Sequence, residues 1–418
     1  MTDFQPRSLG DVVELKRGYD LPARLRSDGP YALVSSSGLS DRHVEARVKG
    51  PGVVTGRYGT IGQVFFVEGD FWPLNTTLYV RDFKGNDPRF IFYFLQTLDW
   101  QKFNDKSGVP GVNRNDAHRE PVLIPDPVDQ RAIAKVLGSL DDKIELNRRM
   151  NETLEAMAQS IFRDWFVEFG PSRRKMEGAT DPITIMGGLV QDTERAQALA
   201  ELFPATLRDD GLPVGWEEKQ VGDVTLLLRR GLAPSYSDNG ILVINQKCIR
   251  NRAVSFTAAR RHDAAKRPAK DRLLEEYDVV VNSTGVGTLG RVATVRGLKE
   301  AATADSHVTI CRADTSKVSK LVLSLFIEGQ EALIETLGHG STGQTELSPA
   351  SLSAMVFPVA PEPVQLVFES LVMPLRDLVT SNSEQSLTLA ETRDLLLPKL
   401  MSGEICLSEA EVLAEPAH

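Results

Sequence analysis

The sequence predicts an α+β protein in which two mostly-β globular domains are joined by two long helices that form an antiparallel coiled coil. Three observations predict this pseudo-twofold duplicated architecture. Two stretches have heptad periodicity, each stretch follows a segment of short apolar runs, and the second half of the chain repeats the first. The length of 418 residues is sufficient for two or more domains.

We expect residues 1–128 to form the first globular domain. A short helix or turn at residues 9–15 should open it. Apolar runs at residues 31–34, 52–55, 63–67 and 77–80 then alternate with Gly, Pro, Asn and Asp, which is typical of strands and tight turns. Residues 88–103 are rich in aromatic side chains and are interpreted as a helix, and residues 106–115 as an exposed polar loop.

Residues 129–168 are predicted to form the first long helix. Its apolar seam has alternating spacings of four and three residues, and from Ile133 to Trp165 a helix would measure roughly 48 Å. Pro125 and Pro127 precede the helix, and Gly170 and Pro171 should end it. The seam consists of Ile133, Leu137, Leu140, Ile144, Asn147, Asn151, Leu154, Ala158, Ile161 and Trp165.

A linker is expected at residues 169–213, with a short helical patch near residues 194–202. Residues 214–360 should then repeat the globular domain. Residues 9–12 match 221–224, residues 59–64 match 287–292, and residues 123–125 match 356–358. A period this long indicates a tandem duplication and not a solenoid.

Residues 361–402 are predicted to form the second long helix, and residues 403–418 an acidic, frayed tail. Adding 235 to each position of the first seam gives the second seam, again with polar residues in its two middle layers. The second seam consists of Phe368, Val372, Leu375, Val379, Asn382, Ser386, Leu389, Arg393, Leu396 and Leu400.

If the two helices are antiparallel, position i should lie opposite position 533 minus i. This hypothesis places Asn147 opposite Ser386, Asn151 opposite Asn382, and Trp165 beside Phe368. Ile133 would lie by Leu400. Leu140 would face Arg393, whose side chain would have to reach outward to water.

Composition narrows the class of protein. No apolar run approaches the 18 residues that a membrane-spanning helix needs, and the N-terminal residues lack the apolar core of a signal peptide. The three scattered cysteines indicate a reducing compartment, so we expect a cytoplasmic protein. The net charge of −9 argues against nucleic acid by itself, but residues 247–272 hold nine Lys or Arg against two Asp.

Catalytic motifs are not found in the sequence. Residues 285–290 spell a dinucleotide fingerprint, but a strand pattern follows where that motif requires a helix, so we interpret them as a hairpin turn. We find no Walker lysine loop, no zinc motif and no nucleophile elbow. The chain is therefore expected to bind a partner and not to catalyse a reaction, with no metal site.

Loops that carry polar and basic residues are the candidate binding sites, because Arg, Lys, Asn, Gln, Ser and Thr can contact base edges and phosphates. Any single polar or basic residue of this kind is more often an ordinary surface residue than a DNA contact. In the first domain the DNA-binding candidates are Arg57, Tyr58, Thr60, Lys106, Asn113, Arg114, Asn115, His118 and Arg119. In the second they are Asn245, Gln246, Lys247, Arg250, Arg252, Arg260, Arg261, Ser283, Thr284, Arg291, His339, Ser341, Thr342, Gln344 and Thr345.

Over essentially its whole length the chain resembles the specificity subunits of type I restriction–modification enzymes. The strings that carry the resemblance are residues 124–127 and 130–134, residues 137–146 (LGSLDDKIEL), residues 147–151 and residues 160–166 (SIFRDWF). Residues 56–62 resemble the glycine turn of this family, and residues 211–216 resemble its entry to the second domain. In the second copy Ser283, Thr284 and Gly285 replace the Gly-Arg-Tyr turn, so its DNA contacts are not transferable from the first.

The resemblance implies that each domain is a target recognition domain for one half of a split, asymmetric DNA sequence and that the helices set the spacing of the halves. It implies double-stranded DNA, two methylation subunits and, through these, restriction subunits as partners. The chain would be non-catalytic within a site-specific deoxyribonuclease and adenine-N6 methyltransferase complex. It would need no cofactor itself, whereas the other subunits would use S-adenosylmethionine, ATP and Mg²⁺.

Two alternatives remain open at the level of the sequence. One is a two-domain scaffold that binds protein or carbohydrate through its β domains. The other is a stand-alone enzyme whose catalytic residues form no familiar motif.

Overall fold

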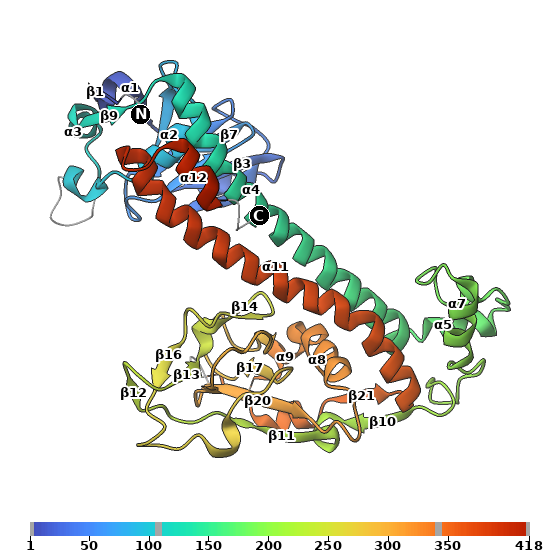
Figure 1. The fold of residues 1–418 in the computed structure, drawn as a ribbon. Coiled ribbons are helices and arrows are strands. Elements are labelled where there is room, and N and C mark those ends of the chain that lie inside the picture. Colours follow the sequence, from blue (N-terminus) through green and yellow to red (C-terminus); the bar gives the residue numbers. More distant parts are fainter. Residues whose placement is uncertain (1–3, 105–110, 339–344, 415–418) are drawn as a thin grey trace. The chain divides into compact units, whose positions relative to one another are not determined.

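The computed structural model describes residues 4–104, 111–338 and 345–414. It divides into two compact units, residues 1–148 with 383–418 and residues 149–382. Each unit contains one mostly-β domain and one stretch of each long helix, and Figure 1 shows these elements. The predicted α+β class is therefore confirmed.

In the described part of the first β domain, from β1 to β9, the strands form three sheets. The strands β2 (Glu14–Arg17), β8 (Thr77–Asp82), β5 (Gly52–Gly56) and β6 (Val64–Val67) form an antiparallel sheet in that order. A second sheet has the order β4 (Gly38–His43), β3 (Tyr31–Ser35), β7 (Phe71–Pro73), with β3 and β7 parallel. The strands β1 (Gln5–Ser8) and β9 (Pro121–Ile124) form an antiparallel pair.

The second β domain, from β10 to β21, repeats this topology. Its main sheet has the order β11 (Thr225–Arg230), β20 (Val308–Ala313), β17 (Val279–Asn282), β18 (Val292–Thr294). The second sheet has the order β12 (Tyr236–Ser237), β16 (Arg260–His262), β13 (Ile241–Ile244), β19 (Ala302–Ala304), with β13 and β19 parallel. The pair β10 (Glu217–Gln220) and β21 (Val356–Val359) corresponds to β1 and β9. The matching strand order supports the predicted duplication.

Short helices complete both domains. In the first they are α1 (Leu9–Val12), η1 (Ala23–Leu25), α2 (Pro88–Gln96), η2 (Trp100–Phe103) and α3 (Arg114–Arg119). In the second they are η4 (Val221–Val224), η5 (Gln246–Cys248), η6 (Lys270–Arg272), α8 (Lys320–Gly329), α9 (Glu331–Thr336) and α10 (Pro349–Ser353), besides the short strands β14 (Ile249–Arg250) and β15 (Ala253–Val254). The single helix predicted at residues 88–103 is wrong, because Thr97 ends α2 and the Asp99 side chain caps a separate 3₁₀ turn at Gln101 N.

The first long helix, α4 (Pro127–Phe162), begins two residues earlier than predicted. The Asp126 carboxylate accepts hydrogen bonds from the backbone N–H groups of Val128 (2.7 Å) and Asp129 (3.0 Å). Pro127, which has no N–H to satisfy, is well suited to the first helical position. A π-helical turn, η3 (Arg163–Val167), follows.

The second long helix, α11 (Glu362–Ser402), is antiparallel to α4 within each unit. In the first unit Asn147 Nδ2 donates to Ser386 Oγ (3.3 Å) and to Gln385 Oε1 (2.9 Å). In the second unit Asn382 Nδ2 donates to Asn151 Oδ1 (2.9 Å). Trp165 and Phe368 have ring centroids 5.8 Å apart. The predicted register is confirmed at these layers.

Two regions are more ordered than the sequence suggested. The predicted linker contains α5 (Gly170–Met176), α6 (Pro182–Ile185) and α7 (Thr193–Glu201). Apolar residues of α6 and α7, among them Ile185 and Leu199, join the core of the second unit. The prediction of a frayed tail is wrong, since residues 407–414 form α12 (Leu407–Ala414) and bury Ala410 and Ala414 in the core of the first unit. Small side chains let this helix lie close to that core.

Candidate nucleic-acid interface

A glycine-containing turn connects β5 to β6 in the first β domain. It occupies residues 57–62 and is closed by a hydrogen bond from Gly56 N to Gln63 O (3.4 Å). Gly59 has a φ of +80°, which favours glycine, and this lets the chain reverse within six residues. The Arg57 guanidinium lies 4.4 Å from the centroid of the Tyr58 ring, so the two side chains project as one stacked pair.

A second segment, some fifty residues later, pairs with this turn. Val112 N donates to Arg57 O (2.9 Å), and Tyr58 forms a β-bridge with Gly111. Asn113 then caps α3, because its Oδ1 accepts from Asn115 N (3.0 Å). The pairing therefore brings residues 57–58 and 113–115, which the sequence analysis selected separately, onto one surface.

These two segments line an open hollow of about 390 Å³. Two arginines besides Arg57 contribute to it, namely Arg17 from β2 and Arg114 from α3. Among the described residues that line it there is no carboxylate. Arg17 pairs with Asp20 outside the hollow (3.1 Å), so Arg57 and Arg114 supply its positive charge. Its lining residues are Arg17, Arg57, Tyr58, Leu78, Val112, Asn113, Arg114 and Asn115.

Other candidates of the first domain make contacts within the fold. His118 Nε2 accepts a hydrogen bond from Leu15 N (3.0 Å), and burial, together with the charge of Arg114, lowers the pKa of the imidazole. Arg119 is largely exposed and pairs with Asp116 (3.0 Å). Thr60 lies half-buried in the turn, and Lys106 lies outside the described residues.

The second β domain has a corresponding turn between β17 and β18, which confirms the interpretation of residues 285–290 as a hairpin. It is closed by a hydrogen bond from Asn282 N to Arg291 O (2.9 Å). Leu347 N donates to Ser283 O (2.8 Å), as Val112 N does to Arg57 O in the first domain. No helix follows the glycines, so a dinucleotide could not be held by a helix N-terminus here.

Beside this turn, the hairpin β14–β15 presents basic side chains. Asn251 and Arg252 connect its strands with φ of +52° and +58°, as a type I′ turn requires. Arg250 and Arg252 line an open hollow of about 420 Å³ together with Arg291, Asn251 and Glu331 of α9.

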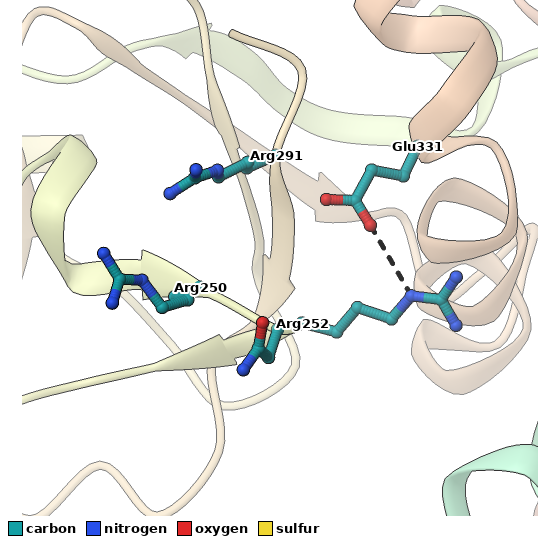
Figure 2. Close-up of a pocket in the computed structure, with 5 residues that line it drawn as sticks. Arg250, Arg252, Arg291 and Glu331 are labelled. Carbon is teal, nitrogen blue, oxygen red and sulfur yellow. Dashed lines mark ion pairs between the residues drawn. The ribbon is translucent and has the colours of Figure 1, made fainter. Parts of the chain in front are cut away.

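Three arginines and a single carboxylate line this hollow. Figure 2 shows Arg250 and Arg291 extending to the same side, whereas Arg252 reaches toward Glu331. The Arg252 Nε to Glu331 Oε2 distance is 3.6 Å. Among the described residues, neither Arg250 nor Arg291 has an ion-pair partner, so two positive charges remain to bind an anion.

A polar cluster supports the base of the second turn. Gln246 Nε2 donates to Thr284 Oγ1 (2.7 Å), and Thr284 Oγ1 lies 2.9 Å from His307 Nδ1. The Asn245 side chain accepts from Lys247 N (2.9 Å) and so shapes the segment that leads to Arg250. His307 was not among the sequence candidates, and only its proximity to Thr284 in the fold draws attention to it.

The remaining candidates of the second domain have other environments. Ser283 is fully buried, and its Oγ lies 2.6 Å from Thr309 Oγ1, so its side chain has a structural role. The Arg260 guanidinium lies 3.4 Å from the Tyr236 ring centroid, and Arg261 pairs with Glu300 (2.7 Å). Lys247 and Thr345 are exposed; His339, Ser341, Thr342 and Gln344 lie outside the described residues.

Sequence reasoning missed Arg17, Asn251 and Val286, which belong to the same surfaces. Arg17 lines the first hollow and Asn251 the second. Val286 occupies the second turn and is 93% exposed. A search for polar residues could not select a valine, although its position between two glycines was a usable signal.

Over residues 4–104, 111–338 and 345–414 we find no group of three or more His, Cys, Asp or Glu side chains placed to hold a metal ion. Within the same part of the chain, no helix has the length and apolarity needed to cross a membrane.

Comparison with known proteins gives a consistent result. Residues 1–156 match the model of the type I restriction modification DNA specificity domain. The chain is 26% identical to the HindI specificity subunit of Haemophilus influenzae, with 97% of this chain and all of the relative aligned. It is 24% identical to the MjaIX specificity subunit of Methanocaldococcus jannaschii, over 81% of this chain and 74% of that one.

A solved structure shows the same fold. The type I restriction–modification S subunit from M. genitalium superposes with a TM-score of 0.57 at 14% identity, covering 96% of both chains. The family model thus covers residues 1–156, and over nearly its whole length the chain is similar in sequence and in fold to specificity subunits of type I restriction–modification systems.

Proposed function

We propose that this chain is the sequence-specific DNA-recognition subunit of a type I restriction–modification complex. Each β domain reads one half of a bipartite, asymmetric site, and the two long helices set the spacing of the halves. The observation that carries this proposal is that each domain presents a glycine turn at an equivalent place with a basic hollow beside it, the two hollows being lined by different elements.

The chemistry of both hollows fits duplex DNA. Arginine guanidinium groups can hold phosphates, and they can form two hydrogen bonds to one guanine. Asparagine and glutamine side chains can form two hydrogen bonds to one adenine. The first hollow supplies Arg57, Arg114 and Asn115, and the second supplies Arg250 and Arg291. Because the half-site surfaces have different side chains, they recognise different sequences, which makes the complete site asymmetric.

The chain itself contributes recognition and assembly. Two methylation subunits bind along the long helices, methylate adenine with S-adenosylmethionine, and connect the chain to restriction subunits that use ATP and Mg²⁺. The alternative of a scaffold for protein or carbohydrate has no observation in its favour.

The test uses the full chain assembled with its methylation subunits. Replacing Arg114 or Arg291 by Ala should weaken binding to duplex DNA and lower the methylation rate. For an arginine that contacts phosphate, the slope of log affinity against log salt should fall by about 0.9. For one that contacts a base, discrimination at a single base pair should fall by about 1–3 kcal/mol.

Matched controls come from the same domains. Arg81→Ala removes an arginine that pairs with Glu14 in the first domain, and Arg229→Ala removes one that pairs with Asp271 in the second. Both should bind DNA like the unmodified chain. Unchanged affinity and methylation rate for both Arg114→Ala and Arg291→Ala would reject the proposed interface.

A further inference from the structure

The recognition turn of the second domain contains two residues more than that of the first. Corresponding hydrogen bonds close the two turns, Gly56 N to Gln63 O and Asn282 N to Arg291 O. They enclose residues 57–62 in the first domain and residues 283–290 in the second. The bonds from Val112 to Arg57 and from Leu347 to Ser283 align the beginnings of the turns, and the match of residues 59–62 with 287–290 aligns their ends, so the extra residues are Gly285 and Val286.

This insertion presents an apolar side chain to solvent. Val286 is 93% exposed, more than any other large apolar residue among those described. Gly285 before it has a φ of +106°, and a Cβ there would lie 2.3 Å from Thr288 Oγ1. Gly287 after it has a φ of +70°. Because these glycines allow a bend on both sides, the valine stands at the tip of the turn.

The tip lies next to the basic hollow of the same domain. Arg291 Nη2 donates to Gly287 O (2.9 Å), so a guanidinium of that hollow is held against the residue that follows Val286. A polyanion bound to Arg250 and Arg291 would therefore lie within reach of the valine. On the base edges of DNA, the apolar group exposed in the major groove is the C5-methyl of thymine.

We propose that Val286 is a specificity-determining residue that contacts a thymine methyl group in the major groove of the second half-site. The inference rests on the proposed DNA recognition. It names the chemical group of the DNA that one residue contacts at one base pair. Contact with the methyl would bury apolar surface that is exposed in the free protein, and a cytosine at that position would lack the methyl group.

The test is a scan of the cognate duplex, identified by mapping methylated adenines, with deoxyuridine replacing each thymine of the second half-site in turn. This replacement removes only the methyl group. Affinity is measured for the complete methylation complex with the unmodified chain, with Val286→Ala and with a deletion of Gly285 and Val286. The deletion gives the turn the length that the first domain already uses. Leu226→Ala, which shortens another exposed apolar residue on β11 of the same unit, is the control.

One replacement should weaken binding of the unmodified chain roughly fourfold, as expected for the loss of one methyl contact. The same replacement should have no effect on Val286→Ala or on the deletion variant, both of which already bind thymine-containing DNA more weakly. Leu226→Ala should respond like the unmodified chain. If every replacement affects Val286→Ala and the unmodified chain equally, the inference is overturned. Loss of discrimination between cognate and scrambled DNA by the unmodified complex would instead reject the proposed function.

Discussion

Gln130 and Gln365 occupy equivalent positions of the two copies, and both are almost completely buried. Gln130 Oε1 accepts from Asp87 N (3.0 Å), and its Nε2 donates to Pro125 O (2.9 Å). Gln365 Oε1 accepts from Ser319 N (2.7 Å), and its Nε2 donates to Ala360 O (2.7 Å). In each copy one glutamine thus connects the start of a domain helix with the start of a long helix.

Replacing Gln130 by Leu should destabilise the first unit by about 1–3 kcal/mol, because a buried N–H and a buried carbonyl would lose their partners. Urea unfolding of the full chain measures this change. Gln101→Leu alters an exposed glutamine of the same unit and should change stability little. Equal stability of the two variants would show that the buried bonds contribute nothing measurable.

Protonation of His118 should weaken its contact with Leu15. Burial lowers the pKa of His118 below the ordinary value of 6.5, so the unfolded chain binds the proton at a higher pH than the folded chain. The contribution to stability is complete above pH 6.5 and is lost as the pH falls through the lower folded value. The hydrogen-exchange protection factor of the Leu15 amide should therefore decrease between pH 7.5 and pH 5.

The Val13 amide provides an internal reference, because it donates to Leu9 O and not to the histidine. A parallel decrease at both amides would indicate general loosening of the unit, contrary to this prediction.

At the scale of elements, the polar layers define how α4 and α11 pair. The contact between Asn151 and Asn382 lies inside a seam that is otherwise largely apolar. In coiled coils such a layer specifies register at a cost in stability. It therefore distinguishes the observed pairing from helices shifted by one heptad.

Replacing Asn382 alone by Leu should cost about 1–2 kcal/mol, since Asn151 would face an apolar side chain. Replacing both Asn151 and Asn382 by Leu should recover that loss or exceed it. Chemical denaturation of the three chains tests this non-additivity. If the two substitutions destabilised the chain additively, the Asn151 and Asn382 side chains would not be coupled, contrary to this prediction.

A buried ion-pair network connects both helices to the second β domain within the second unit. Arg376 of α11 is 1% exposed and bonds to Glu155 of α4 and to Glu328 of α8, each at 2.5 Å. At the equivalent position of the first copy, Asp141 pairs with Arg393 (2.6 Å). The side chain that was expected to reach outward thus finds a partner in its own unit, and the charge at this position is reversed between the copies.

Arg376→Met should destabilise the second unit by about 3–5 kcal/mol, because Glu328 would remain buried and unpaired. Adding Glu328→Gln should restore part of the loss, because the uncompensated charge disappears. Thermal unfolding of the full-length variants measures both effects. Equal unfolding temperatures for the single and double variants would argue against charge burial as the cause.

At the scale of the whole molecule, the proposed function makes the helix pair a ruler for the DNA site. Inserting seven residues into both helices, after Arg148 and before Ser383, preserves the heptad phase and adds about 10 Å of helix. The gap between the methylated half-sites should then grow by about three base pairs at 3.4 Å each. Sequencing of methylated adenines in cells that carry the variant measures the length of this gap.

An insertion of seven residues in α4 alone serves as the control, because it disrupts the pairing of the seams and should abolish methylation. If the matched insertion left the gap unchanged, the ruler would be rejected.

Much of this fold could be predicted because local patterns encode it. The seam spacing predicted both long helices and the contacts of Asn147 and Asn151, and turn residues delimited four of the nine strands described for the first domain. The end of α2 at Thr97 is followed by a local cap, Asp99 on Gln101 N, which the sequence analysis did not use. The order of α12 could not be predicted, because the packing of Ala410 depends on neighbours that are distant in sequence. At the candidate site, Arg57 and Arg114 were selected from the sequence, but their closeness in space was not predicted. Val286 was not selected.

The sequence by itself determined the duplication, the two helices and the family resemblance, because periodicity and repeated strings are properties of the chain. The antiparallel register was a hypothesis that the structure confirmed at three layers. Only the tertiary structure decided which polar residues share a surface. It assigned Ser283 to the interior and His118 to a backbone contact, and it gathered Arg250, Arg252 and Arg291 around one hollow. The physical reason is that β-pairing connects segments far apart in the chain, and burial or exposure of a side chain follows from that pairing.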